Sequence, residues 1–339
     1  MRKLSKISNG VKATAIANAN IALVKYWGKR NKELILPYNS SISMTCDGLF
    51  TITTVEFSEK YKEHTVIIND KEFKKDEKNI HGHIDRICKM AGISGRARVV
   101  SESNFPVAAG LASSASGFAA LTMAATAAAG LKLSPKQLSI LTRQGSGSAC
   151  RSIFSGFVEW LRGEKKDGSD SYARQIADKD YWPEFRMITT IVEIKKKPVS
   201  SRAGMAQTVE TCPYYKGWLR TVKEDLKLVR GGIKERNFEK VAQAAEFNCL
   251  KMHALMITTK PAIIYWIPAT MEIIHAVRKM REDGISAYFT IDAGPNVKVI
   301  CLKKDEKEIN KRLLKLEGVK KTIICKPGDG AKIINKHLF

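Results

Sequence analysis

A run of small residues between a predicted strand and a predicted helix constrains this chain more than any other feature. Residues 104–118 read N-F-P-V-A-A-G-L-A-S-S-A-S-G-F. Residues 97–100 precede the run with a strand pattern, and the alanine-rich residues 118–129 follow it with a helical one. Small side chains let a ligand reach the main chain, and the start of a helix offers N–H groups and a positive dipole end to an anion. The stretch therefore predicts a phosphate-binding turn, with a serine cap on a buried helix as the alternative.

This loop matches neither the P-loop nor the Rossmann glycine pattern. Residues 106–115 instead resemble the P-x-x-x-G-L-[GA]-S-S-[AS] loop of the GHMP small-molecule kinases. The resemblance implies ATP as a cofactor, with its phosphates held around Ser101, Asn104, Gly110, Ala112, Ser113 and Ser114. It also implies Mg²⁺, in contact with the hydroxyl group of Ser114.

Length and composition are those of an ordinary globular protein. A chain of 339 residues suggests two lobes, which we place at residues 1–186 and 187–339 because a Y-W-P run at 181–183 marks the approach to a boundary. No apolar run reaches the roughly 20 residues that span a bilayer, so we expect no membrane partner. The basic first residues lack the apolar core of a signal peptide, so we expect a cytoplasmic location.

The net charge of +23 is the one extreme value. It is compatible with nucleic-acid binding or with strongly anionic small-molecule substrates. The lysines are spread along the chain among acidic residues, without an RNP-like motif, so we favour small anions and expect no nucleic-acid partner. Seven scattered cysteines without a C-x-x-C pair argue against a zinc site or a secreted disulfide framework, and leave a single disulfide open.

Cations, aromatic residues and hydroxyl groups gather near the N-terminus. Lys25 and Lys29 flank Tyr26 and Trp27, and three serines follow shortly afterwards, namely Ser40, Ser41 and Ser43. Basic side chains beside aromatic ones often form only a surface edge. Together with the hydroxyl groups, however, they predict a site for a small, highly charged ligand.

Arg151 is the single charged residue in a neutral, small-residue stretch at 145–158. A guanidinium group in such a place suits a phosphate or a carboxylate, and the alternative is an internal ion pair with Glu159 or Asp170. A second mixture of cations and hydroxyl groups lies at residues 195–202, which end in Ser200, Ser201 and Arg202. Charge runs are usually just solvated, but the paired serines make an anion-facing loop credible.

Asp292 follows a near-continuous apolar strand at residues 286–291 and precedes an A-G-P turn. A carboxylate at the end of a buried strand is well placed for catalysis, and a turn-forming cap is an equally good interpretation from this segment alone. A further strand is expected at 297–302.

Hydrophobic periodicity predicts the remaining elements. We expect helices at 79–91, from Ser134 to Gln144, and at 214–229, 239–256 and 268–283. We expect a hairpin or meander from residues 50–57 and 63–68. His81 and His83 have no metal-site partners at suitable spacing, so we expect surface histidines.

Six motifs taken together resemble the diphosphomevalonate decarboxylase family of the GHMP kinase superfamily. They are N-I-A-L-V-K-Y-W-G-K-R at 20–30, N-S-S-I-S at 39–43, the small-residue loop, G-S-G-S-A-C-R-S at 145–152, V-S-S-R-A-G-M at 199–205 and D-A-G-P-N at 292–296. Their order and spacing fit nearly the whole chain. The resemblance implies a two-lobed α/β fold of the α+β GHMP type with a ribosomal-protein-like first lobe, and a homodimer.

The resemblance also implies an activity and a set of roles. The reaction is ATP-dependent decarboxylation of 5-diphosphomevalonate, in which Asp292 orients or deprotonates the 3-hydroxyl group, Lys25 offsets charge beside it and Arg151 grips the substrate carboxylate. The expected substrate-binding residues are Tyr26, Trp27, Lys29, Ser146, Ser148, Ser200, Ser201 and Arg202. Relatives that decarboxylate 5-phosphomevalonate or only phosphorylate mevalonate, a sugar or homoserine kinase of the same fold, and a basic nucleic-acid-binding protein remain as alternatives.

Overall fold

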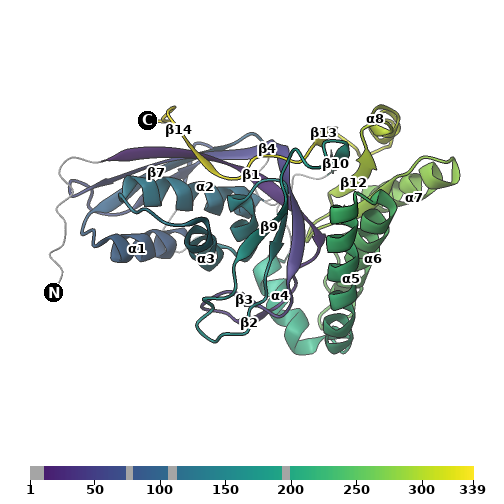
Figure 1. The fold of residues 1–339 in the computed structure, drawn as a ribbon, viewed down its shortest axis with the longest axis horizontal. Coiled ribbons are helices and arrows are strands. Elements are labelled where there is room, and N and C mark those ends of the chain that lie inside the picture. Colours follow the sequence, from purple (N-terminus) through teal and green to yellow (C-terminus); the bar gives the residue numbers. More distant parts are fainter. Residues whose placement is uncertain (1–10, 74–78, 106–112, 193–198) are drawn as a thin grey trace.

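The computed structural model describes residues 11–73, 79–105, 113–192 and 199–339. They form two lobes side by side, each with its own sheet and helices (Figure 1). The predicted phosphate-binding residues Gly110 and Ala112 lie outside the described residues, as do residues 195–198 of the second basic run. No helix in the described ranges is long and apolar enough to cross a membrane.

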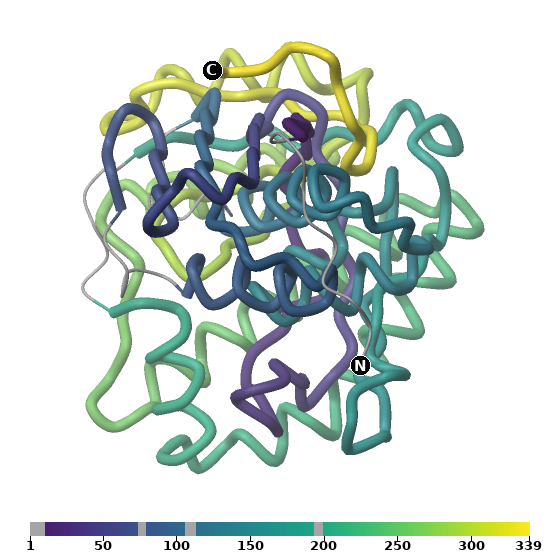
Figure 2. Tube along the Cα trace, turned by 90° about the vertical axis from the view of Figure 1, so that its left-hand side faces the viewer, coloured from purple at the N-terminus to yellow at the C-terminus, as the bar shows by residue number. Residues whose placement is uncertain are grey.

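Two long antiparallel strands, β1 (Lys12–Val24) and β4 (Ser41–Ser58), form the centre of the first sheet. Its order is β14–β1–β4–β7–β5–β6, and β8 and β9 extend it from the first part of β4. The other strands of this lobe are β2 (Lys29–Asn31), β3 (Leu36–Pro37), β5 (Thr65–Ile68), β6 (Lys71–Glu72), β7 (Arg96–Ser103), β8 (Phe157–Trp160), β9 (Ala173–Ala177) and β14 (Lys332–Ile334). β14 brings the C-terminal segment back onto β1, along the top of the molecule in Figure 2.

The hairpin or meander predicted from residues 50–57 and 63–68 is wrong. Residues 50–57 lie in β4, which pairs with β1 and β7, whereas β5 pairs in parallel with β7. Parallel neighbours need a crossover, and helix α1 (Ile80–Ala91) supplies it between β5 and β7. Alternation identified the strands, but the partner of β5 lies beyond a helix in the sequence.

Helices α1, α2 (Ser113–Ala128) and α3 (Pro135–Gly145) cover one face of the first sheet (Figure 1). The alanine-rich α2 lies against β1 and β4, where its small side chains allow close packing. The start of α3 is as predicted, because the Ser134 hydroxyl group accepts from the N–H of Gln137 in a capping box and Pro135 occupies the first turn.

The expectation of surface histidines on α1 is wrong. His81 and His83 are both buried, and His83 Nε2 lies 2.8 Å from the Thr122 hydroxyl oxygen with its ring edge-on to Phe118. Burial lowers the pKa of His83 to about 3, so it is neutral. Position 83 falls on the helical face that already carries Ile80, Ile84 and Ile87, so the core of the lobe includes it.

The second sheet has the order β11–β12–β10–β13 and is antiparallel throughout. Its strands are β10 (Phe185–Ile191), β11 (Tyr288–Ile291), β12 (Val297–Leu302) and β13 (Lys321–Cys325), and the helices of the lobe are α4 (Ser201–Thr211), α5 (Tyr215–Glu235), α6 (Phe238–Ile257), α7 (Pro268–Glu282) and α8 (Glu306–Leu314). The helices predicted at 214–229, 239–256 and 268–283 are confirmed as α5, α6 and α7. The boundary that we placed at 186/187 falls inside β10, and β14 returns to the first sheet.

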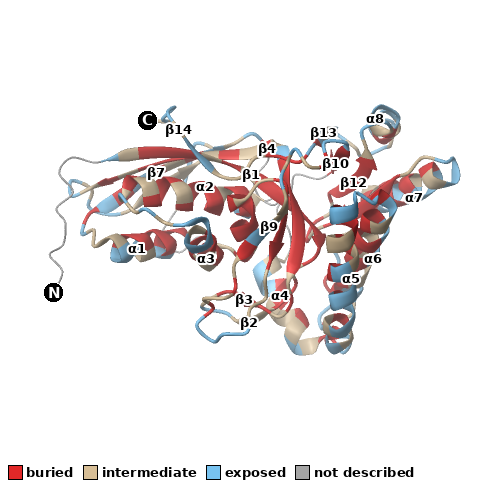
Figure 3. Cartoon of the chain, viewed as in Figure 1, coloured by how far each residue is buried: buried red, intermediate tan, exposed pale blue. Residues whose placement is uncertain are grey.

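The two lobes meet along the second half of β1. Residues 19–24 of β1 are all buried, because α6 of the second lobe packs on this part of the strand. Figure 3 shows buried residues on both sides of this contact. Side chains that follow β1 and β11 are therefore delivered to the interior of the joint.

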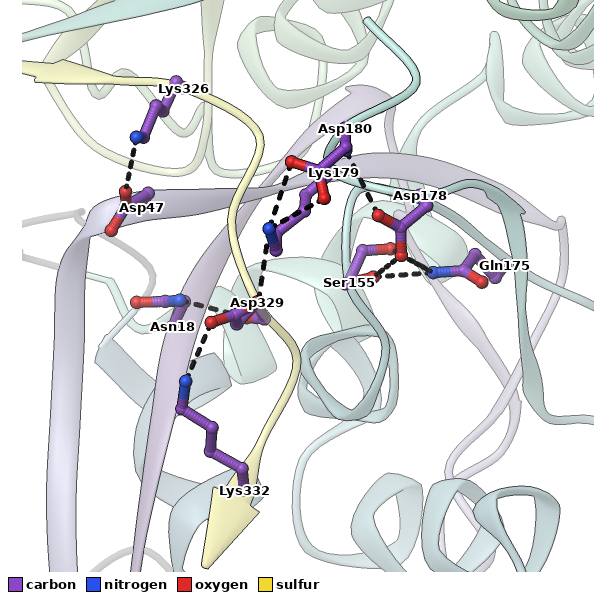
Figure 4. A network of polar contacts seen from close by, with 10 residues as sticks. All are labelled: Asn18, Asp47, Ser155, Gln175, Asp178, Lys179, Asp180, Lys326, Asp329 and Lys332. Atoms are coloured by element: carbon purple, nitrogen blue, oxygen red, sulfur yellow. Dashed lines mark hydrogen bonds and ion pairs between the residues drawn. The ribbon is translucent and has the colours of Figure 1, made fainter. Parts of the chain in front are cut away.

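An exposed set of ion pairs lies at the edge of the same joint, where residues 326–332 cross β1 and β4 (Figure 4). Lys332 Nζ is 2.8 Å from Asp329 Oδ2, Lys179 Nζ is 2.9 Å from Asp180 Oδ2, and Lys326 Nζ is 3.6 Å from Asp47 Oδ2. We call the residues drawn in Figure 4 the outer network, namely Asn18, Asp47, Ser155, Gln175, Asp178, Lys179, Asp180, Lys326, Asp329 and Lys332. Pairs of this kind contribute about 0–1 kcal/mol each.

Candidate active site

A cluster of three charged side chains lies in the joint between the lobes. Asp292 follows β11, Lys298 lies in β12 and Lys25 follows β1. Lys25 Nζ is 2.7 Å from Asp292 Oδ1, and Lys298 Nζ is 3.3 Å from Asp292 Oδ2. The lysine side chains are 2% and 1% exposed, whereas the Asp292 side chain is 24% exposed. The carboxylate therefore lies between two buried cations and stays accessible to a small ligand. We call these three residues the buried cluster.

The buried cluster keeps Asp292 ionised. Burial by itself raises the pKa of Asp292, but the charges of Lys25 and Lys298 outweigh it and hold the pKa well below its usual range. Burial lowers the pKa of Lys298, and the charge of Asp292 opposes that change. A carboxylate in this state accepts hydrogen bonds through its remaining lone pairs, as a substrate hydroxyl group requires.

The A-G-P turn that carries Asp292 is fixed by its neighbours. The N–H of Gly294 donates to the carbonyl oxygen of Asp292 at 2.8 Å, and the Thr270 hydroxyl group donates to the carbonyl oxygen of Pro295 at 2.8 Å. Asn296 Oδ1 accepts from the N–H of Val192 at 2.8 Å and so ties the turn to the end of β10. The carbonyl oxygen of Asp292 belongs to the turn, while its carboxylate faces the two lysines.

Arg151 lies in the short 3-10 helix η1 (Gly147–Ile153) and is buried. Its Nε donates to Asn20 Oδ1 at 3.1 Å and to the Ser43 hydroxyl oxygen at 2.9 Å, and its Nη1 donates to the Ser41 hydroxyl oxygen at 2.5 Å. These acceptors are all neutral. Burial lowers the pKa of Arg151, and the charge of Asp292 is among those that oppose that change.

The alternative ion pair for Arg151 is not observed. Glu159 pairs with Arg174 at 3.0 Å and with Arg230 at 2.5 Å, and Asp170 accepts from backbone N–H groups of the loop at 164–165. Among the described residues Arg151 has no carboxylate within ion-pair distance. A buried cation without an acidic partner is costly, so an anionic ligand is the natural partner for its charge.

Tyr26 and Trp27 carry buried polar atoms that have no partner in the part of the chain that the structure describes. Tyr26 packs edge-on against Trp160 with ring centroids 4.7 Å apart, and neither its hydroxyl group nor the Trp27 Nε1 has a hydrogen-bond partner among the described residues. Burial raises the pKa of Tyr26, and the charges of Arg151 and Arg202 oppose that change. Buried polar atoms are normally satisfied, so these two are candidates for contact with a ligand.

A second group of cations lies beside Tyr26. Burial, together with the charges of Arg202 and Lys32, lowers the pKa of Lys29 to about 8. Ser200 caps α4 by accepting from the N–H of Ala203 at 3.2 Å, Ser201 is the first residue of that helix, and Arg202 is exposed. Three clustered cations near a helix start suit an oligovalent anion.

Ser146 and Ser148 lie on either side of the start of η1. Ser146 ends α3 with its N–H donating to the carbonyl oxygen of Thr142, and the carbonyl oxygen of Ser148 accepts from Asn20 Nδ2 at 3.0 Å. Between them, Gly147 has no room for a side chain, since a Cβ there would be 2.7 Å from the Trp160 ring. The backbone of this stretch is therefore packed tightly onto the wall that carries Tyr26.

The predicted nucleotide residues are spread over two elements. Ser113 and the exposed Ser114 begin the 16-residue helix α2. Ser101 is buried in β7 with its hydroxyl group 2.8 Å from that of Thr53, and Asn104 ties the end of β7 to Phe50 and Gly48 through its side chain. The start of α2 thus presents helix N–H groups and an open hydroxyl group, which fit phosphate and its magnesium ion.

No group of three or more His, Cys, Asp or Glu side chains in the described ranges is arranged to hold a metal ion. All seven cysteines are buried free thiols.

Sequence reasoning missed Lys298 and did not recognise what Ser41 and Ser43 contact. A lysine inside the apolar run V-K-V-I-C-L at 297–302 was a usable signal, because a buried lysine needs an acidic partner. Ser41 and Ser43 were expected to face the ligand, and in the structure their hydroxyl groups accept from Arg151. They hold the cation that we expect to bind the ligand.

Comparison with known proteins adds two family matches. The model described as "Diphosphomevalonate decarboxylase-like N-terminal domain" matches residues 17–173, and the one described as "Mevalonate 5-diphosphate decarboxylase C-terminal domain" matches residues 187–334. Diphosphomevalonate decarboxylase ERG19 of Gibberella zeae is 39% identical over 318 residues, which cover 87% of this chain and 82% of that protein.

Solved structures of the same family are similar to this chain over nearly its whole length. The mevalonate diphosphate decarboxylase from Enterococcus faecalis, in a structure describing its mevalonate diphosphate mediated ATP binding mechanism, is 40% identical with a TM-score of 0.90. That match covers 96% of this chain and 100% of the other. A structure described as MDDEF in complex with MVAPP, AMPPCP and magnesium is also 40% identical, with the same coverage and a TM-score of 0.91.

Proposed function

The chain belongs to the diphosphomevalonate decarboxylase family, and on that premise we propose that it converts (R)-5-diphosphomevalonate and ATP into isopentenyl diphosphate, ADP, phosphate and carbon dioxide. The observation that carries the proposal is the buried cluster, an ionised carboxylate between two lysines on the D-A-G-P-N turn. The ligands named for the solved relatives support both substrates and magnesium.

In the first step the 3-hydroxyl oxygen attacks the γ-phosphorus of ATP, and ADP leaves with the electrons of the broken P–O bond. We place the hydroxyl group on Asp292, which accepts its hydrogen bond and directs the oxygen lone pair toward phosphorus. A carboxylate with so low a pKa is a weak base, so orientation is its main contribution, and the hydroxyl proton passes to Asp292 only late in the step, as the new P–O bond forms. Lys25 lies within reach to offset the developing charge.

In the second step the C–O bond to the new phosphate breaks, and phosphate leaves with the electron pair. The bond to the carboxylate carbon then supplies electrons to the new double bond and releases carbon dioxide. We assign Arg151 to the substrate carboxylate, because it is a buried cation held in place by neutral acceptors. Its position orients the carboxylate until the C–C bond breaks.

The start of α2 is the proposed place for the ATP phosphates, with Ser113 and Ser114 as donors. Magnesium would be held there with Ser114 and would neutralise phosphate charge during transfer.

We propose the diphosphate rather than the monophosphate as substrate. Lys29, Arg202 and Lys32 lie close enough together for their charges to lower the pKa of Lys29, so the free protein carries unneutralised positive charge there. Among the described residues no ion pair offsets Lys29, Lys32 or Arg202. These three cations match the charge of a diphosphate better than that of a single phosphate.

We further propose a cytoplasmic homodimer whose second lobe begins with β10, close to residue 186. Phe247, Ile257 and Ile264 of the second lobe are exposed apolar side chains on α6 and the loop after it. Their exposure supports contact with a second copy of the chain. Light scattering on the eluted protein would separate a dimer of twice 37.7 kDa from the monomer.

The activity is tested by supplying ATP and magnesium with 5-diphosphomevalonate, 5-phosphomevalonate or mevalonate, and measuring ADP and carbon dioxide together. Equal amounts of both products from the diphosphate alone are expected. ADP without carbon dioxide would make the protein a kinase, and turnover of the monophosphate would move it to that substrate. Lack of turnover with all three would contradict the proposal and favour the nucleic-acid alternative.

A further inference from the structure

The main chain of Lys25 is held from both lobes. β1 ends at Val24, so the peptide groups of Lys25 lie beyond the paired part of the strand. Asn39 Nδ2, from the first lobe, donates to the carbonyl oxygen of Lys25 at 2.8 Å. Asn248 Oδ1, from α6 of the second lobe, accepts from its N–H at 2.8 Å. The residue whose ammonium group contacts Asp292 is thus fixed at the backbone by two side-chain amides.

Asn248 is itself anchored by charged residues of the second lobe. Its Nδ2 donates to Asp225 Oδ2 at 2.6 Å, and Lys251 Nζ lies 2.6 Å from the same oxygen. Asn248 and Asp225 are 0% and 4% exposed. A chain of contacts therefore runs from Lys251 through Asp225 and Asn248 to the N–H of Lys25.

Only one assignment of hydrogen-bond donors and acceptors is possible along this series of contacts. The N–H of Lys25 can only donate and the Asp225 carboxylate can only accept, so position 248 must accept on one side and donate on the other. An amide satisfies both demands. An ionised carboxylate at 248 would satisfy the first and would face Asp225 with like charge on the other side.

We propose that Asn248 is a positioning residue for the proposed reaction: together with Asp225 it sets the backbone position of Lys25, and through it the ammonium group beside Asp292. The inference rests on the proposed function for its activity readout. It gives α5 and α6 a role in the site although they carry none of the residues assigned to substrate.

The charged groups around position 248 determine how an aspartate placed there would titrate. The charged side chains that face it among the described residues are Asp225 from α5 and Lys251 from α6, and Lys25 connects it to Asp292 and Lys298 of the second sheet. His253, farther along α6, stays neutral in the working range, because burial lowers its pKa to about 3.

The test uses Asn248→Asp, the charge-conserving swap Asp225→Asn with Asn248→Asp, and the control Asn237→Asp. Asn237 caps the start of the same helix, α6. Its side chain only accepts a hydrogen bond, from the N–H of Lys240, so an aspartate at this position would cap the helix equally well. kcat at saturating ATP and 5-diphosphomevalonate is measured from pH 5.5 to 8.5, with the unfolding midpoint at each pH.

At pH 8 we expect Asn248→Asp to lower kcat about tenfold or more, because small displacements of a catalytic group cost rate steeply. At pH 5.5 we expect its kcat to return to within about threefold of the parent, because one proton shared by the two carboxylates restores the missing donor. The swap should stay within about threefold of the parent at every pH, since the new amide at position 225 would donate to the new carboxylate at position 248. The control should match the parent.

An unchanged kcat of Asn248→Asp at pH 8 would overturn the inference, and so would a loss that is equal at all pH values. If the swap fails to fold, the pH profile of the single variant still decides. Amide exchange of the peptide that contains Lys25, followed by mass spectrometry against the parent at each pH, repeats the comparison without turnover. Faster exchange in Asn248→Asp at pH 8 than at pH 5.5, relative to the parent, supports the inference, and no difference contradicts it. If the parent protein shows no turnover, the exchange measurement still tests the role of Asn248. The missing turnover then counts against the proposed function alone.

Discussion

The buried cluster and the outer network contain the same residue types in different surroundings. In both, aspartates meet lysines at 2.7–3.6 Å. The lysines of the buried cluster are at most 2% exposed, whereas Asp180 is 80% exposed. Burial decides the outcome, because the same charges interact strongly in the interior and are screened at the surface. In the buried cluster the two lysines hold the pKa of Asp292 well below its usual range.

The largest effect is expected from Asp292→Asn in the buried cluster. The amide keeps the shape but cannot accept the hydroxyl proton and leaves Lys25 and Lys298 without their anion. We expect kcat to fall by roughly 10²–10⁴, as for other acid–base groups, while the substrate still binds. Steady-state kinetics with a separate binding titration check this. Near-normal turnover would remove Asp292 from the mechanism.

Arg151→Lys comes next, because it keeps the charge and removes the fork. Lysine cannot reproduce donation to Asn20, Ser41 and Ser43 together. We expect kcat/KM to fall by roughly 10–100-fold through misplacement of the substrate carboxylate. Arg162→Lys, a partly exposed arginine paired with Glu164, is the matched control. Equal kinetics for both variants would assign Arg151 a purely structural role.

A smaller effect concerns the pH dependence of substrate binding. The pKa of Lys29 is lowered to about 8, so the free protein carries this charge below pH 8 and loses it as the pH rises further. We expect KM for 5-diphosphomevalonate to rise above pH 8, by at most about tenfold per pH unit. Lys29→Arg should abolish the rise, because arginine stays protonated. A rise that persists in Lys29→Arg would place the titrating group elsewhere.

The smallest effect is expected in the outer network. Asp180→Asn removes an exposed partner of Lys179, which also lies 4.0 Å from Asp329. We expect the free energy of unfolding to change by at most about 0.5 kcal/mol and kcat to stay the same. Denaturant unfolding and the coupled assay check both quantities. A large loss of activity would show that an exposed ion pair of the outer network matters for turnover. Burial would then not be what distinguishes the two regions.

Features set by local sequence were predictable. The start of α3 follows from Ser134, Pro135 and Gln137, which act within one turn. Asp292, Lys25 and Arg151 stood out because each is a charged residue next to an apolar or neutral stretch, and the structure pairs Lys25 with Asp292. Family motifs made the resemblance specific, and the family matches confirm it.

Features set by distant partners were not predictable from the same reasoning. His83 is buried because α2 brings Thr122 and Phe118 against it, and the parallel pairing of β5 depends on a crossover helix. Lys298 acquires its meaning only when β11 and β12 pair and bring it to Asp292. Each of these depends on contacts between segments that are not adjacent in sequence.

The central claim is that two buried lysines keep Asp292 ionised for the reaction. The most direct test is the pH profile of kcat for Lys298→Met, which removes one cation and keeps an unbranched apolar side chain in β12. With one cation fewer, burial raises the pKa of Asp292 toward or above its ordinary value, so the acid side of the profile should move to higher pH than in the parent. An acid side that stays where it is in the parent, with kcat unchanged, would contradict the claim.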